Sequence, residues 1–454
     1  MRNVDPPVTI GSSTTEAAPL RAQPAKLRPL RASSPRERLR ATLHALGPGL
    51  VSGAADDDPS GIATYSQAGA QYGYGLLWIA LVTTPLMIGV QLAAARIGRV
   101  TGAGLAANLR RHYPRPLVWA VVALLVCANT VNITADIAAM GAAMQLLVGG
   151  GQHWHALVIG LALAAVQVRL PYARLAAILK WLCLALFAYF IVLFYVHVDW
   201  PSAIKAMVWP DITLDVDTLT VVVAVVGTTI SPYLFFWQAA QEVEEMRRKG
   251  RRPLLEDPAT AAGSLLRIRF DTVSGMVLSN LIAVAIMLAA AATLHAGGIV
   301  HIETAVQAAE ALRPLAGDHA YILFSLGIIF TGLLAVPVLA GSAAYAVAES
   351  FGWSGSLDLR LREARGFYAI IVGATLAGTL LDFTPIDPIK ALFYSALVNG
   401  IVSVPIMLLL VLLASNRAAL GRLRLGGTAY VLAWTATLLV TAAVGFMLVT
   451  QLRA

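Results

Sequence analysis

Three consecutive carboxylates, Asp56, Asp57 and Asp58, interrupt an apolar stretch that runs from Leu43 to Ala95. Pro59 follows them and removes a backbone donor, and Gly61 favours a change of backbone direction. A charge at bilayer depth costs about 2.5–3.5 kcal/mol even on a lenient insertion scale, so such residues are usually kept for function. We therefore interpret residues 56–61 as an unwound segment inside a membrane helix.

A second break is predicted at residues 227–233, where Gly-Thr-Thr-Ile-Ser-Pro-Tyr interrupts another apolar segment. Unwinding frees backbone carbonyls beside the carboxylates of the first break and the hydroxyls of the second. Together these groups form an all-oxygen, net-negative site, which suits a hard cation such as Mg²⁺, Mn²⁺ or Ca²⁺. The alternative for the second segment is a simple helix kink at Pro232.

Asp58 immediately precedes the proline and is the predicted direct ligand. Asp56 and Asp57 point roughly 100° apart around any remaining helix, so at most one of them shares the face of Asp58 closely. The other could line an entry path, bond to backbone or carry a proton. The predicted metal-binding residues are Asp58, Thr228, Ser231, Asp57, Asp56 and Ser60.

The amino-acid composition indicates what class of protein contains these breaks. The 454 residues are 58% hydrophobic and only 13% charged, which excludes an ordinary soluble protein and indicates an all-α polytopic membrane protein. The net charge of +8 could suggest a nucleic-acid partner. The basic residues, however, lie in short blocks between apolar runs, which indicates membrane topology and no nucleic-acid partner.

Eleven hydrophobic segments are predicted after residues 1–40, which form an expected disordered cytoplasmic tail rich in Pro, Ser, Ala and Arg. The rest of the chain, residues 41–454, is the expected transmembrane domain. The fourth and ninth segments are shorter than the ~20 residues needed to span a bilayer. The segments are about 43–70, 75–96, 117–147, 154–168, 173–197, 218–243, 270–295, 319–349, 366–383, 388–415 and 427–451.

Charge in the loops supports this count. Alternate loops carry most of the Lys and Arg, whereas the intervening loops hold only Lys205, Arg313 and Lys390. Because cytoplasmic loops are enriched in Lys and Arg, the alternation predicts a multi-pass protein of the cell (inner) membrane, with a cytoplasmic N-terminus and an external C-terminus. The basic loops fall at about 96–115, 169–180, 247–269, 360–365 and 417–424.

The two breaks lie five segments apart, in the first and sixth. Interrupted helices at matching positions of two halves indicate inverted repeats with a binding site near the bilayer midplane. The predicted architecture is therefore five plus five helices and one more. Repeat 1 covers about 43–197, repeat 2 about 218–415, and an extra span about 427–451.

Several short motifs resemble the Nramp family of divalent-metal transporters. They are Gly47-Pro48-Gly49 before the acidic break, residues 67–70 (Gln-Ala-Gly-Ala) and 73–78 (Gly-Tyr-Gly-Leu-Leu-Trp), and Arg96-Ile-Gly-Arg-Val-Thr-Gly102. The resemblance extends in layout over residues 43 to 450. It implies a leucine-transporter-like fold and divalent-metal transport by alternating access.

The departures from the family pattern all favour a harder metal ion and weaker proton coupling. The family's Asp-Pro-Gly-Asn becomes Asp58-Pro59-Ser60-Gly61, which keeps the aspartate and loses the asparagine. Ser231 replaces a methionine, and a hydroxyl prefers harder ions than a thioether does. Tyr233 replaces a histidine linked to proton movement, and the family's Asp-x-x-Glu pair appears as Asp136 and Ala139. The resemblance then implies the divergent branch that includes magnesium transporters.

The predicted function is a secondary transporter or facilitator of Mn²⁺ and Mg²⁺ with weak or absent proton coupling. The metal is substrate, no cofactor is implied, and the expected partners are the cation and the bilayer, with no obligate protein partner. The alternative is an organic-cation or amino-acid transporter of the same fold. An enzyme is not supported, because no two carboxylates are predicted to meet from separate helices.

For other polar residues in or near the predicted spans, the sequence allows more than one role. Asp136 could act as a relay or make a polar contact between helices. Tyr233 and Asn399 are further candidate relay residues, and Asn399 could equally make interhelical hydrogen bonds. Asp271 is expected to pair with Arg267 and Arg269. Glu242, Glu244 and Glu245 are expected to form a solvated helix end, with a cytoplasmic metal exit as the alternative.

Overall fold

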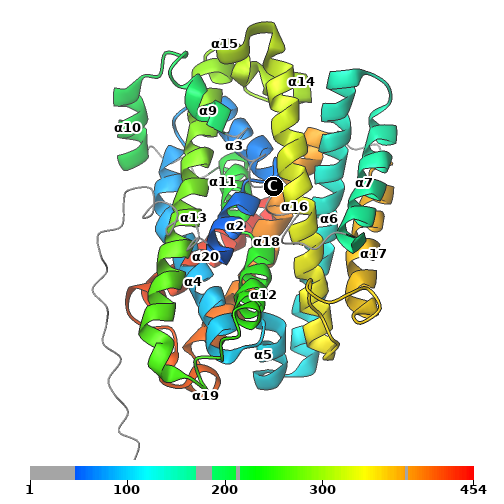
Figure 1. Ribbon diagram of the computed structural model, residues 1–454. Helices are drawn as coiled ribbons and strands as arrows, with labels where there is room; N and C mark the ends of the chain where they lie inside the picture. Colours follow the sequence, from blue (N-terminus) through cyan, green and yellow to red (C-terminus); the bar gives the residue numbers. More distant parts are fainter. Residues whose placement is uncertain (1–46, 170–186, 211–214, 384–386, 454) are drawn as a thin grey trace, which may run out of the picture. The chain divides into compact units, whose positions relative to one another are not determined.

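The computed structural model describes residues 47–169, 187–210, 215–383 and 387–453. All regular secondary structure in these ranges is helical (Figure 1). The main helices are α2 (Pro48–Asp56), α3 (Pro59–Tyr72), α4 (Leu77–Thr101), α5 (Leu105–His112), α6 (Arg115–Val148), α7 (Gln152–Arg169), α9 (Phe187–Val192), α10 (Trp200–Val208), α11 (Val216–Thr229), α12 (Pro232–Arg248), α13 (Ala261–Ala290), α14 (Ala305–Ala309), α15 (Arg313–Ala316), α16 (Ala320–Phe351), α17 (Arg365–Leu381), α18 (Pro388–Ser415), α19 (Arg417–Leu420) and α20 (Gly427–Arg453).

Seven helical stretches within the described ranges are long and apolar enough to cross a membrane. They are Leu77–Thr101, Arg115–Val148, Val216–Arg248, Pro258–His295, Ala305–Phe351, Pro388–Ser415 and Gly427–Leu452. Helix α17 is a shorter apolar helix, as expected for the ninth predicted segment. The fifth predicted segment falls largely on residues 170–186, outside the described residues.

Both predicted breaks are present, and they have the same local construction. Helix α2 ends at Asp56 and α3 begins at Pro59, while α11 ends at Thr229 and α12 begins at Pro232. In each case two residues separate the helices and a proline occupies the first helical position. Proline is favoured there because its missing N–H would have no partner in the first turn. The residues at each break therefore explain locally why the helix is interrupted there.

Small residues bring the two broken helices close to their neighbours. Helices α2 and α3 pack on α13, and α12 packs on α4. A Cβ built on Gly53 would lie 2.4 Å from the Gly275 carbonyl oxygen, and one on Gly98 would lie 2.2 Å from the Ala239 carbonyl oxygen. A side chain cannot fit at such distances. Glycine at these positions lets the backbones touch, as is common between membrane helices.

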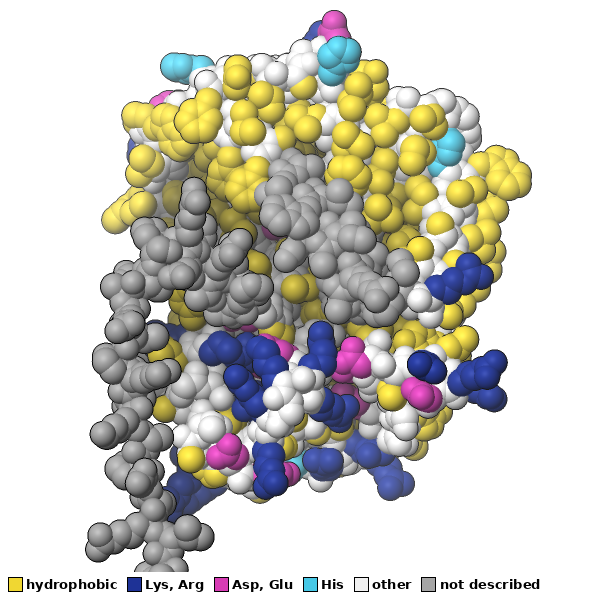
Figure 2. All heavy atoms as spheres, viewed as in Figure 1, with side chains coloured by type: hydrophobic (Ala, Val, Ile, Leu, Met, Phe, Trp, Pro, Cys, Tyr) yellow, Lys and Arg dark blue, Asp and Glu magenta, His cyan; other side chains and the backbone are white. Residues whose placement is uncertain are grey.

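The basic loops converge at one end of the bundle. Arg96 Nη1 donates to the Arg424 carbonyl (2.9 Å), and Arg99 Nη1 donates to the Arg252 carbonyl (2.7 Å). Arg248 pairs with Asp358 at 3.3 Å. These contacts join the ends of α4 and α12 to the loops that follow α12, α16 and α19. Figure 2 shows Lys and Arg gathered there, below a largely apolar surface, and Figure 1 shows α14 and α15 at the other end. We call this end the basic face.

Candidate functional site

Asp58 caps the second half of the first broken helix. Its Oδ1 accepts hydrogen bonds from the Ser60 hydroxyl (2.6 Å) and from the Gly61 backbone N–H (2.8 Å). Asp58 and Ser60 are both buried. An aspartate at this position satisfies donors that the first helical turn would otherwise leave unpaired, and its charge is favourable at a helix N-terminus. The carboxylate is therefore held in place by its own helix.

Asp56 and Asp57 are directed toward a different helix. The hydroxyl of Ser279 on α13 lies 2.9 Å from Asp56 Oδ2 and 3.1 Å from Asp57 Oδ1. The remaining oxygens, Asp56 Oδ1 and Asp57 Oδ2, are buried without a hydrogen-bond partner among the described residues. Within those residues, no three His, Cys, Asp or Glu side chains converge as a ligand set. The consecutive aspartates thus divide into Asp58 and a separate pair.

Two hydrogen bonds and one close approach join the second break to the first. The Tyr233 hydroxyl donates to the Ala55 carbonyl (2.8 Å), and the Tyr65 hydroxyl lies 3.0 Å from Thr229 Oγ1. The close approach is at Gly61. A Cβ built there would lie 3.2 Å from Thr228 Oγ1 and 3.6 Å from the Asp56 carbonyl oxygen. The two breaks therefore meet at Gly61.

The hydroxyls of the second break have different roles. Ser231 Oγ donates back to the carbonyls of Thr228 (2.8 Å) and Gly227 (3.1 Å), so it closes the end of its own helix. Thr228 Oγ1 is buried and has no hydrogen-bond partner in the described chain. Because burying an unpaired hydroxyl is unfavourable, Thr228 is the residue of this break best suited to a bound cation or water.

Asp136 and Asn399 lie on the helices around the breaks. Both are fully buried, and none of their side-chain oxygens or nitrogens has a hydrogen-bond partner within the described ranges. Asp136 is close enough to Asp58 for their charges to interact. Asn399 precedes Gly400 on α18, and Gly400 contacts α11 at Val223 and Gly227. The polar groups of α6 and α18 therefore extend the site around the two breaks.

The expectations for the charged residues near the basic face were wrong. Asp271 accepts hydrogen bonds from the backbone N–H groups of Gly47 (2.8 Å) and Gly49 (2.8 Å), so it caps α2. Arg267 is near enough to act on its charge, but no arginine of the described ranges forms an ion pair with it. Arg267 pairs with Glu242 at 2.8 Å and with Glu245 at 2.9 Å. Glu242 is fully buried on α12, which packs against α4, α16 and α2. It is not a solvated helix end.

The sequence reasoning missed Ser279, and a signal for it exists. Asp271, Gly275 and Ser279 recur every four residues on α13, so they share one helix face. In the structure this face meets α2 along its length: Asp271 caps its start, Gly275 contacts its glycines, and Ser279 reaches its final aspartate. A stripe of small and polar residues in an apolar helix could have predicted the contact.

This arrangement defines a class of protein. Two helices interrupted in mid-span and locked together around a buried set of oxygen donors are typical of secondary transporters with a leucine-transporter-like fold. Solved structures support the fold. A manganese transporter from Eremococcus coleocola matches with a TM-score of 0.69 at 16% identity, covering 91% of this chain and 89% of the other. Mhp1, a nucleobase-cation-symport-1 family transporter, matches with a TM-score of 0.56 at 12% identity, covering 88% and 92%.

Sequence comparison gives the family. The model of the natural resistance-associated macrophage protein-like (Nramp) family matches residues 49–450, and the chain belongs to this family of membrane transporters. The divalent metal cation transporter MntH of Deinococcus radiodurans is 27% identical over 432 residues, which are 92% of each chain. MntH of Yersinia pestis is 30% identical over 297 residues, covering 64% of this chain and 69% of the relative.

Proposed function

We propose that this protein carries divalent metal cations, Mn²⁺ and Mg²⁺, across the cell membrane as a secondary transporter or facilitator. One observation carries the proposal: the Asp58 side chain, the Asp56 carbonyl and the Thr228 hydroxyl gather around Gly61, where the two breaks meet. Carboxylate, carbonyl and hydroxyl oxygens are the donors that hard cations prefer. The names of the MntH relatives agree with a divalent metal as substrate.

Asp58 and Thr228 are the primary proposed ligands. Ser60 holds the Asp58 carboxylate, and Ser231 can offer the lone pairs of its oxygen while its proton bonds to backbone. Asp56 and Asp57 add negative charge beside Ser279 of α13. One of them is proposed as a further ligand, and the other as a residue that lines the entry path, bonds to backbone or carries a proton. This donor set contains no sulfur or imidazole, which favours Mg²⁺ and Mn²⁺ over softer ions.

Proton coupling is proposed to be weak or absent. Asp136, Tyr233 and Asn399 remain the candidate relay residues. Tyr233 donates its proton to a backbone carbonyl, and Ala139 offers no second titratable group one turn after Asp136. Transport driven by the metal gradient alone follows from this proposal.

We further propose eleven spans arranged as two inverted five-helix repeats plus α20, with residues 1–40 as a cytoplasmic tail. The packing supports the repeats, because the first broken helix packs on α13 of the second half and α12 of the second packs on α4 of the first. Alternating access would then move the broken helices relative to their partners. The basic face is proposed to lie in the cytoplasm, which places Arg453 outside.

Metal uptake into proteoliposomes tests the function. Wild-type protein is expected to carry Mn²⁺ and Mg²⁺, and Asp58→Asn is expected to reduce initial uptake at least tenfold because the charged ligand is lost. Asp318→Asn is the matched control, since Asp318 is 96% exposed at the other end of the bundle. Absence of uptake by wild type, or full uptake by Asp58→Asn, contradicts the proposal.

Calorimetry on the purified protein, which measures ligand binding, distinguishes the metal proposal from the alternative of an organic-solute transporter. Mhp1 shows that the fold also occurs in a nucleobase-cation symporter. The close approach of Thr228 to Gly61 favours an ion over a larger solute at this point. Mn²⁺ binding that is lost in Asp58→Asn supports the metal proposal, whereas saturable binding of an organic amine without metal binding supports the alternative.

A further inference from the structure

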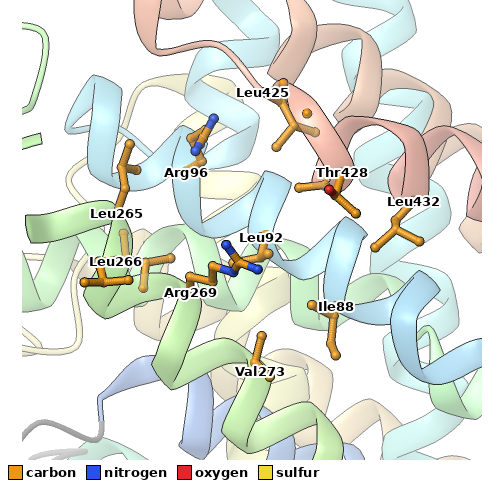
Figure 3. Close-up of a pocket in the computed structure, with 14 residues that line it drawn as sticks. Ile88, Leu92, Arg96, Leu265, Leu266, Arg269, Val273, Leu425, Thr428 and Leu432 are labelled. Carbon is orange, nitrogen blue, oxygen red and sulfur yellow. The ribbon is translucent and has the colours of Figure 1, made fainter. Parts of the chain in front are cut away.

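A groove of about 470 Å³ lies at the basic face between α4, α13 and the start of α20 (Figure 3). Its walls are mainly aliphatic and include Ile88, Leu92, Leu266, Val273 and Leu432. The groove is outside the candidate site, because the site lies at the breaks and the groove opens on the outer side of α13. A hollow with these walls accommodates a hydrocarbon chain.

Two arginines, Arg96 of α4 and Arg269 of α13, are the charged residues that line this groove. Figure 3 shows them beside the leucines from the three helices. Arg96 donates one hydrogen bond to the Arg424 carbonyl, and neither arginine forms an ion pair with a described residue. The groove therefore joins an apolar channel to two guanidinium groups without a neutralising carboxylate.

We propose that this groove binds an anionic phospholipid from the leaflet at the basic face. Its phosphate would lie between Arg96 and Arg269, since guanidinium groups bind phosphate through paired hydrogen bonds. An acyl chain would follow the wall formed by Ile88, Leu92 and Leu432. Basic pockets between membrane helices at the cytoplasmic side are suited to acidic headgroups. A free anion would leave the aliphatic walls exposed to water.

The position of the groove links the lipid to the transport machinery, a step that rests on the proposed function. Leu265, Arg269 and Val273 occupy the outer face of α13, and Arg267 and Asp271 lie roughly 160° around the helix from Arg269. Arg267 holds Glu242 on α12, and Asp271 caps α2. A lipid bound in the groove would restrict the movement of the segment of α13 that contacts both broken helices at the basic face. Anionic lipid is therefore expected to alter the transport rate.

Native mass spectrometry of the purified full-length protein tests the binding. After delipidation, protein mixed with phosphatidylglycerol is expected to retain it at least fivefold more than phosphatidylcholine. Arg269→Gln and Arg96→Gln are each expected to lower retention about fivefold, the effect of one basic residue at an anionic leaflet. Arg362→Gln is the matched control, an exposed arginine on the same face that does not line the groove.

A second variant fills the groove without changing charge. Thr428→Trp is expected to abolish preferential phosphatidylglycerol retention, because Thr428 lines the cavity at an exposed position of α20. Equal losses in Arg362→Gln and Arg269→Gln, or unchanged retention in Thr428→Trp, overturn the proposal. Displacement of the lipid by millimolar inorganic phosphate also overturns it in favour of a simple anion site. This experiment measures lipid binding and not metal transport. Its result can therefore be interpreted even if the protein proves not to carry metal ions.

Discussion

Asp58 shows how one residue can serve both local structure and chemistry. Its carboxylate caps α3 through Ser60 and Gly61, and this holds the side chain at the point where the two broken helices meet. A ligand fixed before the cation arrives loses less conformational entropy on binding. Asp56 and Asp57 lack this fixation by their own helix and depend on Ser279 of another helix.

The preference for hard ions is predicted to reside partly in Ser231. Ser231→Met should increase inhibition of Mn²⁺ uptake by Cd²⁺ about tenfold, because a thioether favours soft cations and roughly 1.4 kcal/mol corresponds to tenfold. Uptake competition measures this. Ser415→Met, at the end of α18, is the control. Equal Cd²⁺ competition in wild type and Ser231→Met would remove Ser231 from the ligand set.

Gly61 is predicted to be required for its lack of a side chain. Gly61→Ala would place a Cβ 3.2 Å from Thr228 Oγ1 and should weaken Mn²⁺ binding about tenfold, a loss of roughly 1.4 kcal/mol. Calorimetry measures the affinity. Gly373→Ala is the matched control, since nothing lies within 4 Å of that position in α17. Unchanged affinity in Gly61→Ala would show that the Thr228 contact is irrelevant to binding.

Helix α13 is the element that organises the first broken helix. Its face with Asp271, Gly275 and Ser279 contacts α2 from the first turn to the last. Its outer face carries the groove with Arg269. Because the two faces belong to one rigid helix, a change at one is expected to be transmitted to the other.

Loss of the cap supplied by α13 should loosen the start of α2. Asp271→Asn is expected to speed hydrogen exchange in residues 47–53 about tenfold, since charged hydrogen bonds contribute roughly 1.5–3 kcal/mol and only part is lost. Exchange measured by mass spectrometry checks this. Asp382→Asn, a buried aspartate paired with His153, should leave those residues unchanged. Equal protection in Asp271→Asn and wild type would contradict the capping role.

At the scale of the whole molecule, charge is sorted between the two ends. The end of α4 meets the loop after α12 through contacts such as Arg99 with Arg252, although the two are 153 positions apart in sequence. This grouping agrees with the alternation of basic loops that the sequence predicts. It supports the placement of the basic face on the cytoplasmic side.

Cysteine labelling in intact cells tests that orientation. In a background with Cys127 and Cys183 replaced by serine, Asp318→Cys should react with a membrane-impermeant maleimide, whereas Ser354→Cys should react only after permeabilisation. Both positions are exposed. Ser354 lies in the loop after α16, which reaches the basic face through Asp358, and Asp318 lies between α15 and α16 at the other end. The difference is expected to be at least fivefold, because the membrane excludes a charged reagent. The reverse pattern would place the basic face outside.

Local features made much of this protein predictable. Hydropathy located helices, proline and glycine located both breaks, and the loop charges located one face. Each of these signals depends on residues close together in the chain. The proline positions are the clearest case, because Pro59 and Pro232 each begin a helix in the structure as their chemistry requires.

Only the tertiary structure decided which polar groups meet. Ser279 is 223 positions from Asp56, and Asp271 is 222 positions from Gly49. Such contacts depend on how each helix is rotated and which neighbour it receives. Helix rotation explains why Asp56 and Asp57 face α13 while Asp58 stays with its own helix, and why Glu242 is buried against Arg267. The sequence by itself therefore determined the breaks and their oxygen chemistry, and the packing of the helices decided how those oxygens are arranged.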